Sequence, residues 1–185
     1  TFQQPFNMSV PGNYLINTWS NVAVDGNSSN DSILNYSVAT SQLTSNFPDT
    51  TNFDNFISGV PGTFLNGWAN STNDQHDWYV YTGSTPSSQT GPSADTTTGT
   101  GNYIYMESTG VTTGVEANLT SKCYDITNLN RPELSFFYHM FGNTMGDLHI
   151  DLSINGVVIQ DIIPAISGNQ GNKWKRAIVN LTPYK

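Results

Sequence analysis

Short runs of alternating or continuous apolar residues recur along the chain, separated by clusters rich in Gly, Asn, Asp and Pro. Such runs are typical of β-strands, because successive side chains point to opposite faces of a strand and turn residues end it. No segment shows the 3.6-residue apolar period of an amphipathic helix. The sequence therefore predicts an all-β protein with strands at residues 14–19, 32–38, 77–81, 102–108, 117–124, 133–141, 147–154, 157–163 and 174–181.

The clearest local signal is the segment Ile154-Asn155-Gly156-Val157. Asn-Gly favours the type I′ turn of a β-hairpin, and apolar alternation flanks it on both sides. Nine short strands joined by turns are typical of a sandwich or jelly roll. We therefore expect a jelly-roll β-sandwich of two antiparallel sheets. The stretch 82–101 is too long for a tight turn and is predicted to be a functional or anchored loop.

An N-terminal segment resembles a later one. Val10-Pro11-Gly12-Asn13-Tyr14 matches Val60-Pro61-Gly62-Thr63-Phe64, and each copy is followed by a Trp. The two copies are either similar turn-and-strand entries that each bury a Trp, or a duplicated opening strand. In both cases we divide the chain into an N-terminal extension or set of extra strands, residues 1–45, and a sandwich domain, residues 46–185.

Composition narrows the function classes. The net charge is −8, so no basic surface is available for nucleic acid. The sequence contains no run of 18 apolar residues, so it predicts no membrane-spanning helix. Only one cysteine is present, so the fold does not rest on disulfides. Low charge and an acidic content dominated by Asp are typical of a secreted or cell-surface protein, and the lack of cysteine pairs favours a bacterial source.

The sequence contains no recognisable catalytic arrangement. Its three glutamates are scattered rather than paired as a glycosidase requires. The Gly-x-Ser-x-Gly and His-Glu-x-x-His motifs are both missing. The three histidines lack the spacing of zinc ligands. We therefore expect a non-catalytic protein, at most an accessory domain of a secreted hydrolase or protease.

From Phe53 onward, consecutive motifs carry a resemblance to a known family. They are Phe53-Asp54-Asn55-Phe56, Gly67-Trp68, Asp74-Gln75-His76-Asp77-Trp78, the loop at 85–97, the segment at 99–107, Leu134-Ser135-Phe136-Phe137-Tyr138-His139-Met140-Phe141-Gly142 and Met145-Gly146-Asp147-Leu148. In this combination, the chain between about residues 47 and 181 resembles the MAM domain family, extracellular modules named after meprin, A5 and a receptor phosphatase.

The resemblance implies a jelly-roll sandwich, no catalysis, and a role in adhesion or interaction at a cell surface, as part of a larger secreted or surface protein. MAM domains commonly hold a structural cation, usually Ca²⁺, and the resemblance places its ligands at Asp54 and Asp77. The vertebrate-type cysteines of the family are missing here.

The residues themselves leave the calcium prediction open. Asp54 and Asp77 lie beside aromatic residues with no Lys or Arg near them in sequence, and Ca²⁺ binds 6–8 oxygens of the kind that Asp, Asn and backbone carbonyls supply. The alternative is that both are solvated carboxylates, or carboxylates in turns that accept hydrogen bonds from backbone N–H groups. Asp74 and Asp95 are further candidate ligands, and Asp95 is otherwise an Asx-turn anchor for the long loop.

An aromatic content of 12% suggests a second function. Jelly rolls often serve as carbohydrate-binding modules, and exposed Tyr79, Tyr81 and Tyr184 are the candidate members of a sugar-stacking platform. The alternative is that the aromatic residues form the core of the sandwich. The sequence thus predicts a protein or glycan partner at a cell surface.

Overall fold

The computed structural model describes residues 12–19, 32–40, 43–59 and 61–185. These residues form strands and one short 3₁₀-helix, Thr182–Tyr184, which confirms the all-β prediction. The strands are β1 (Gly12–Trp19), β2 (Ser32–Thr40), β3 (Leu43–Thr44), β4 (Ala69–Asn70), β5 (Trp78–Thr82), β6 (Asn102–Met106), β7 (Leu119–Thr120), β8 (Cys123–Tyr124), β9 (Glu133–Tyr138), β10 (Asp147–Leu148), β11 (Leu152–Ile154), β12 (Val157–Ile159), β13 (Ile166–Ser167) and β14 (Lys175–Asn180).

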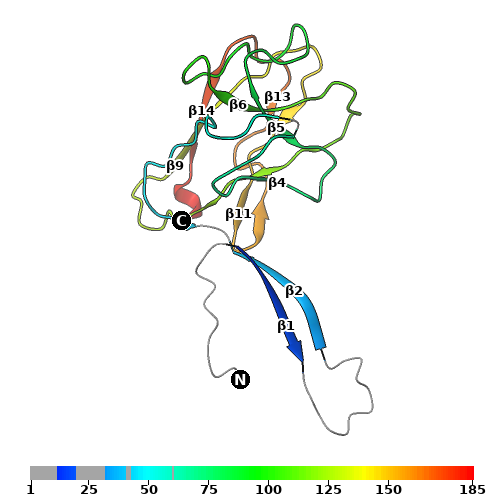
Figure 1. Ribbon diagram of the computed structural model, residues 1–185. Coiled ribbons are helices and arrows are strands. Elements are labelled where there is room, and N and C mark those ends of the chain that lie inside the picture. The colour runs from blue at the N-terminus through cyan, green and yellow to red at the C-terminus, as the bar shows by residue number, and fades with distance from the viewer. Residues whose placement is uncertain (1–11, 20–31, 41–42, 60) are drawn as a thin grey trace.

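The two longest antiparallel ladders among the described strands of the body are β5–β6 and β9–β14 (Figure 1). β5 is buried at its centre, where Val80 is fully inaccessible, and β14 is buried at Val179. The described strands pair in twos, and the short β3–β8 pair is parallel, unlike the antiparallel pairing predicted throughout.

Aromatic rings connect the two ladders. Tyr79 and Tyr81 lie opposite Tyr105 and Tyr103, so the four tyrosines share one face of the β5–β6 ladder. From Tyr103, ring contacts continue to Trp174, His139 and Phe141, which lie next to the β9–β14 ladder. Tyr103 is buried, and Trp174 is half-buried. This chain of edge-to-face contacts forms one side of the core.

The predicted Asn-Gly hairpin is confirmed. β11 and β12 pair around Asn155 and Gly156, whose φ angles of 50° and 81° are those that a type I′ turn requires. The predicted strands at 117–124 and 147–154 are each divided in two. β7 pairs with β4 but β8 pairs with β3, and β10 pairs with β13 but β11 pairs with β12. Each break therefore marks a change of pairing partner, which residue patterns do not reveal.

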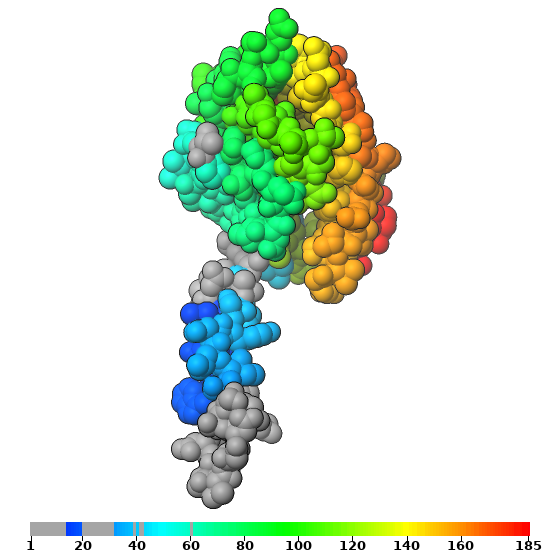
Figure 2. All heavy atoms as spheres, turned by 90° about the vertical axis from the view of Figure 1, so that its right-hand side faces the viewer, coloured from blue at the N-terminus to red at the C-terminus, as the bar shows by residue number. Residues whose placement is uncertain are grey.

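β1 and β2 form an antiparallel hairpin, the arm, that extends away from the body (Figures 1 and 2). Trp19 is 75% exposed, whereas Trp68 is half-buried against Phe53. Of the two interpretations of the repeated segment, the one in which each copy buries a Trp therefore does not hold for the first copy. The division at residue 45 stays a prediction.

We expect Phe56→Ala to lower the free energy of unfolding by about 3–5 kcal/mol, because Phe56 is only 3% exposed and contacts Phe53 and Phe64. Phe137→Ala is the control, since this ring is 52% exposed and its loss should change stability little. Urea denaturation of both variants measures the difference. Equal losses of stability would contradict this placement of the core.

Candidate functional site

The long loop, residues 83–101, connects β5 to β6 and is organised around Asp95, which is 7% exposed. Asp95 Oδ2 accepts hydrogen bonds from the Thr97 and Thr98 N–H groups, both at 2.8 Å, and from Thr97 Oγ1 at 2.6 Å. Asp95 Oδ1 accepts from the Gly101 N–H at 2.8 Å and from Thr98 Oγ1 at 3.2 Å. A carboxylate has about four lone-pair sites, so these donors occupy it fully. Asp95 is thus the anchor of the loop.

The ionised form of Asp95 is favoured by these contacts. Burial opposes ionisation, but the hydrogen bonds from Thr97, Thr98 and Gly101 outweigh it and hold the pKa of the Asp95 carboxyl well below its ordinary value. A carboxyl whose pKa is lowered on folding stabilises the protein above its unfolded pKa of about 4, and this stabilisation is lost as the pH falls toward the folded pKa. The loop should therefore be firmly closed at neutral pH.

Further hydrogen bonds attach the long loop to the body, and three of them reach the two ladders. Tyr103 Oη donates to the Gly83 carbonyl at 2.8 Å, close to where the loop leaves β5. Trp174 Nε1 donates to the Ala94 carbonyl at 2.9 Å, and the Gly91 N–H donates to the Phe141 carbonyl at 3.0 Å. The loop is therefore attached to both ladders.

Asp54 lies at the same end of β6 as Asp95. Its Oδ1 accepts from the Asn102 N–H at 2.9 Å, and its Oδ2 accepts from Asn52 Nδ2 at 2.7 Å. A Cβ on Gly101 would come within 2.0 Å of Asp54 Oδ1, so no other residue fits at this position without a shift. Asp54 and Asp95 therefore meet at the Gly101–Asn102 backbone, where each caps one N–H group.

Asp74 and Asp77 lie at the opposite end of the β5–β6 ladder. Asp77 immediately precedes Trp78, whose indole donates to the Ala117 carbonyl, and Asp74 Oδ2 accepts from the neighbouring Asn118 N–H at 2.5 Å. Asp77 is half-buried, and within the described part of the chain no hydrogen bond reaches its carboxylate.

The four predicted calcium ligands therefore form two separate pairs. Asp54 contacts Asn102, which pairs with Thr82 at the end of β5. Asp77 immediately precedes Trp78, at the start of β5. Four residue steps of about 3.3 Å place these two ends about 13 Å apart, too far for two carboxylates to share one Ca²⁺ with bonds of about 2.5 Å. Among the described residues, no three His, Cys, Asp or Glu side chains are grouped to hold a metal ion. A calcium ion shared by Asp54 and Asp77 does not fit this arrangement.

The predicted tyrosine platform also lacks the expected geometry. Tyr79, Tyr81 and Tyr184 are half-buried rather than exposed. The Tyr79 and Tyr81 rings meet Tyr105 at interplanar angles of 74° and 62°, so the tyrosines on this face pack edge to face. Tyr184 lies in the 3₁₀-helix after β14. Among the tyrosines of the β5–β6 ladder, Tyr103 is buried in the core and the other three are half-buried beside it.

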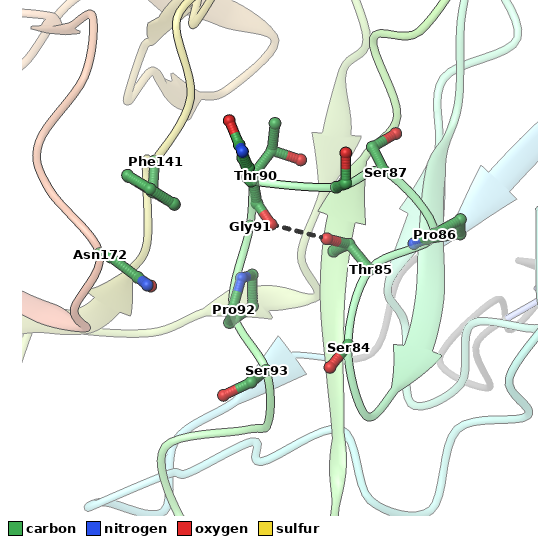
Figure 3. A pocket seen from close by; sticks show the side chains of 12 residues that line it. Ser84, Thr85, Pro86, Ser87, Thr90, Gly91, Pro92, Ser93, Phe141 and Asn172 are labelled. Carbon is green, nitrogen blue, oxygen red and sulfur yellow. Dashed lines mark hydrogen bonds between the residues drawn. The ribbon is translucent and has the colours of Figure 1, made fainter.

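Sequence reasoning missed a pocket of about 310 Å³ beside the long loop (Figure 3). Phe141 and Asn172 lie across it from the loop residues. The abundance of Ser and Thr in the loop was visible in the sequence, but the approach of Phe141 and Asn172 was not, because they are distant along the chain. The residues that line the pocket are Ser84, Thr85, Pro86, Ser87, Ser88, Gln89, Thr90, Gly91, Pro92, Ser93, Phe141 and Asn172.

Comparison with known proteins decides the family. The profile of the MAM domain, meprin/A5/mu, matches residues 55–185, well over half of the chain. The chain belongs to the MAM domain family. Together with the all-β structure, this match confirms the predicted jelly-roll sandwich. It also makes the chain a non-catalytic module, as the sequence predicts.

The relatives are animal proteins. The chain is 35% identical to neuropilin-1a of Danio rerio over 130 residues, which are 64% of this chain and 14% of that protein. It is 33% identical to human MAM domain-containing protein 2 over 109 residues, 59% of this chain and 16% of that protein. It is 34% identical to mouse MAM domain-containing glycosylphosphatidylinositol anchor protein 2 over 124 residues, 60% of this chain and 13% of that protein.

The match to this chain thus covers only 13–16% of the length of these relatives. No solved structure matches the chain. The predicted bacterial source finds no support, because these relatives come from fish and mammals. In the described part of the chain, no helix has the length and apolar character needed to cross a membrane.

We expect Asp95→Asn to lower the free energy of unfolding by about 2 kcal/mol, because an amide nitrogen would replace an acceptor that faces several donors. The long loop should also become sensitive to protease at neutral pH. Asp125→Asn is a matched control, since Asp125 accepts from the Thr127 N–H and hydroxyl in the same Asp-x-Thr arrangement but holds no long loop. Thermal unfolding and limited proteolysis compare the variants. Similar behaviour of the two would contradict the anchoring role of Asp95.

Proposed function

We propose that this MAM domain is an interaction module of a larger protein that is secreted or held at a cell surface. The match over residues 55–185 carries the proposal. It is supported by the kinds of protein that contain the related domain, since one relative is named as a glycosylphosphatidylinositol anchor protein. Such anchors hold proteins to a membrane without a transmembrane helix in the mature chain.

An exposed apolar face on the β9–β14 ladder supports a protein partner. Phe137 is 52% exposed and Ile178 is 57% exposed. Phe137 pairs with Arg176, and Ser135 pairs with Ile178, so the four side chains share one face of the ladder. The opposite face contains the buried Val179. Adjacent exposed apolar residues beside an arginine have the composition that protein interfaces favour.

The calcium and tyrosine predictions do not enter this proposal. A structural calcium ion stays a prediction of the family resemblance, and the separation of Asp54 from Asp77 gives it no support. A carbohydrate partner at Tyr79, Tyr81 and Tyr184 is likewise a prediction without a suitable platform. The β9–β14 face, with Phe137 and Ile178 exposed beside Arg176, is the surface that we propose for a protein partner.

Binding to intact cells of the source organism tests the function. We expect the labelled chain to bind the cells saturably and to lose at least about tenfold in affinity in the double variant Phe137→Ser and Ile178→Ser, because truncating central apolar anchors removes most of the binding energy. The matched control is Val157→Ser with Val158→Ser, which removes two exposed apolar residues from the β11–β12 hairpin. Lack of saturable binding, or equal loss in both variants, would contradict the proposal.

A further inference from the structure

The pocket beside the long loop is polar but uncharged. None of its lining residues is Asp, Glu, Lys or Arg, although the chain as a whole carries a net charge of −8. Hydroxyl and amide groups provide its polar atoms, and the Phe141 ring with two prolines provides its apolar surface (Figure 3). An uncharged lining offers nothing to neutralise an ionic ligand, and its many hydroxyls disfavour a purely apolar one. A neutral ligand rich in hydroxyl groups fits this chemistry best.

Several polar side chains of the pocket are available to a ligand. Thr85 Oγ1 donates a hydrogen bond to the Thr90 carbonyl, and Ser87 Oγ lies 2.9 Å from Thr109 Oγ1, within hydrogen-bond distance. By contrast, no hydrogen bond within the described part of the chain uses the side chains of Ser84, Ser88, Gln89, Thr90 and Ser93. Hydroxyl and carboxamide groups both donate and accept hydrogen bonds, as the hydroxyls of a sugar do.

The shape of the pocket is fixed before any ligand binds. Gly91 adopts a φ of 62°, and a Cβ there would lie 2.5 Å from Thr85 Oγ1, so the two sides of the loop approach closely. The Gly91 N–H also donates to the Phe141 carbonyl. Asp95 closes the remainder of the loop, as described above. Binding therefore requires little ordering of the loop, which lowers its entropic cost.

We propose that this pocket binds a neutral saccharide, with the C–H face of one sugar ring against Phe141 and its hydroxyls toward the free Ser, Thr and Gln side chains. The volume of about 310 Å³ is at the lower end of ligand pockets, so a short segment of a glycan fits, with the remainder in solvent. This site is separate from the β9–β14 face and goes beyond the proposed protein interaction. It also places saccharide recognition on the long loop instead of on the tyrosines.

The test is a titration followed by ¹H–¹⁵N NMR, with maltotriose, cellotriose, laminaritriose, mannotriose and chitotriose as probes at millimolar concentration. At least one probe is expected to shift the amide signals of residues 84–93 and Asn172 saturably. The variant Ser88→Ala with Gln89→Ala should weaken this binding about tenfold, which corresponds to about 1.4 kcal/mol. Both side chains are exposed, so the variant is expected to fold.

Ser153→Ala with Gln160→Ala is the matched control, because both of these residues are exposed and lie outside the pocket. Its affinity for the probe should equal that of the unaltered chain. The proposal is overturned if none of the five probes shifts the pocket signals saturably, or if the pocket variant binds as tightly as the control. Cell binding through Phe137 and Ile178 is measured separately, so failure at one site is distinguishable from failure at the other.

Discussion

The buried carboxylate of Asp95 is the interaction on which one end of this MAM domain depends. A loop as long as residues 83–101 has no strand or helix of its own to order it. Asp95 supplies that order, because its two oxygens accept from three backbone N–H groups and two hydroxyls of the same loop. Hydrogen bonds to an ionised acceptor are stronger than neutral ones, so a short segment can close without a hydrophobic core of its own.

The aromatic contacts give this loop a rigid support. The tyrosines of the β5–β6 ladder pack through Trp174 onto the end of the β9–β14 ladder, and Trp174 also donates to the loop at Ala94. The same residues thus form part of the core and position the loop above it. Tyr79 and Tyr81 pack edge to face against Tyr105, whereas the loop presents hydroxyls that make no hydrogen bond within the described part of the chain.

Local features of the sequence predicted local structure well. Asn155-Gly156 specified its hairpin because both residues tolerate a positive φ, and Asp95 could be identified as a turn anchor because Asp accepts from N–H groups two or three residues ahead. The fold class followed from strand-like patterning and the family motifs. The strand boundaries could not be predicted from the sequence. A change of pairing partner between β7 and β8, for example, does not alter the alternation of apolar and polar residues.

The arrangement of the candidate calcium ligands and of the pocket could not be predicted, because it depends on distances in space between residues that are far apart in the sequence. Asp54 and Asp77 were joined by resemblance, yet the β5–β6 ladder separates them and gives Asp54 the Asn102 N–H as a partner. Phe141 and Asn172 reach the pocket from residues that follow β9 and precede β14, and neither is near the loop in sequence. Such convergence is a property of the tertiary fold alone.

Hydrogen exchange at the amides of Thr97, Thr98 and Gly101 tests the central claim most directly, namely that Asp95 and protein donors close the loop without a cation. The measurement is made at neutral pH in a metal chelator and again with added Ca²⁺. We predict that the three amides are strongly protected in both conditions and to the same extent. Rapid exchange in the chelator, reversed by Ca²⁺, would contradict the account.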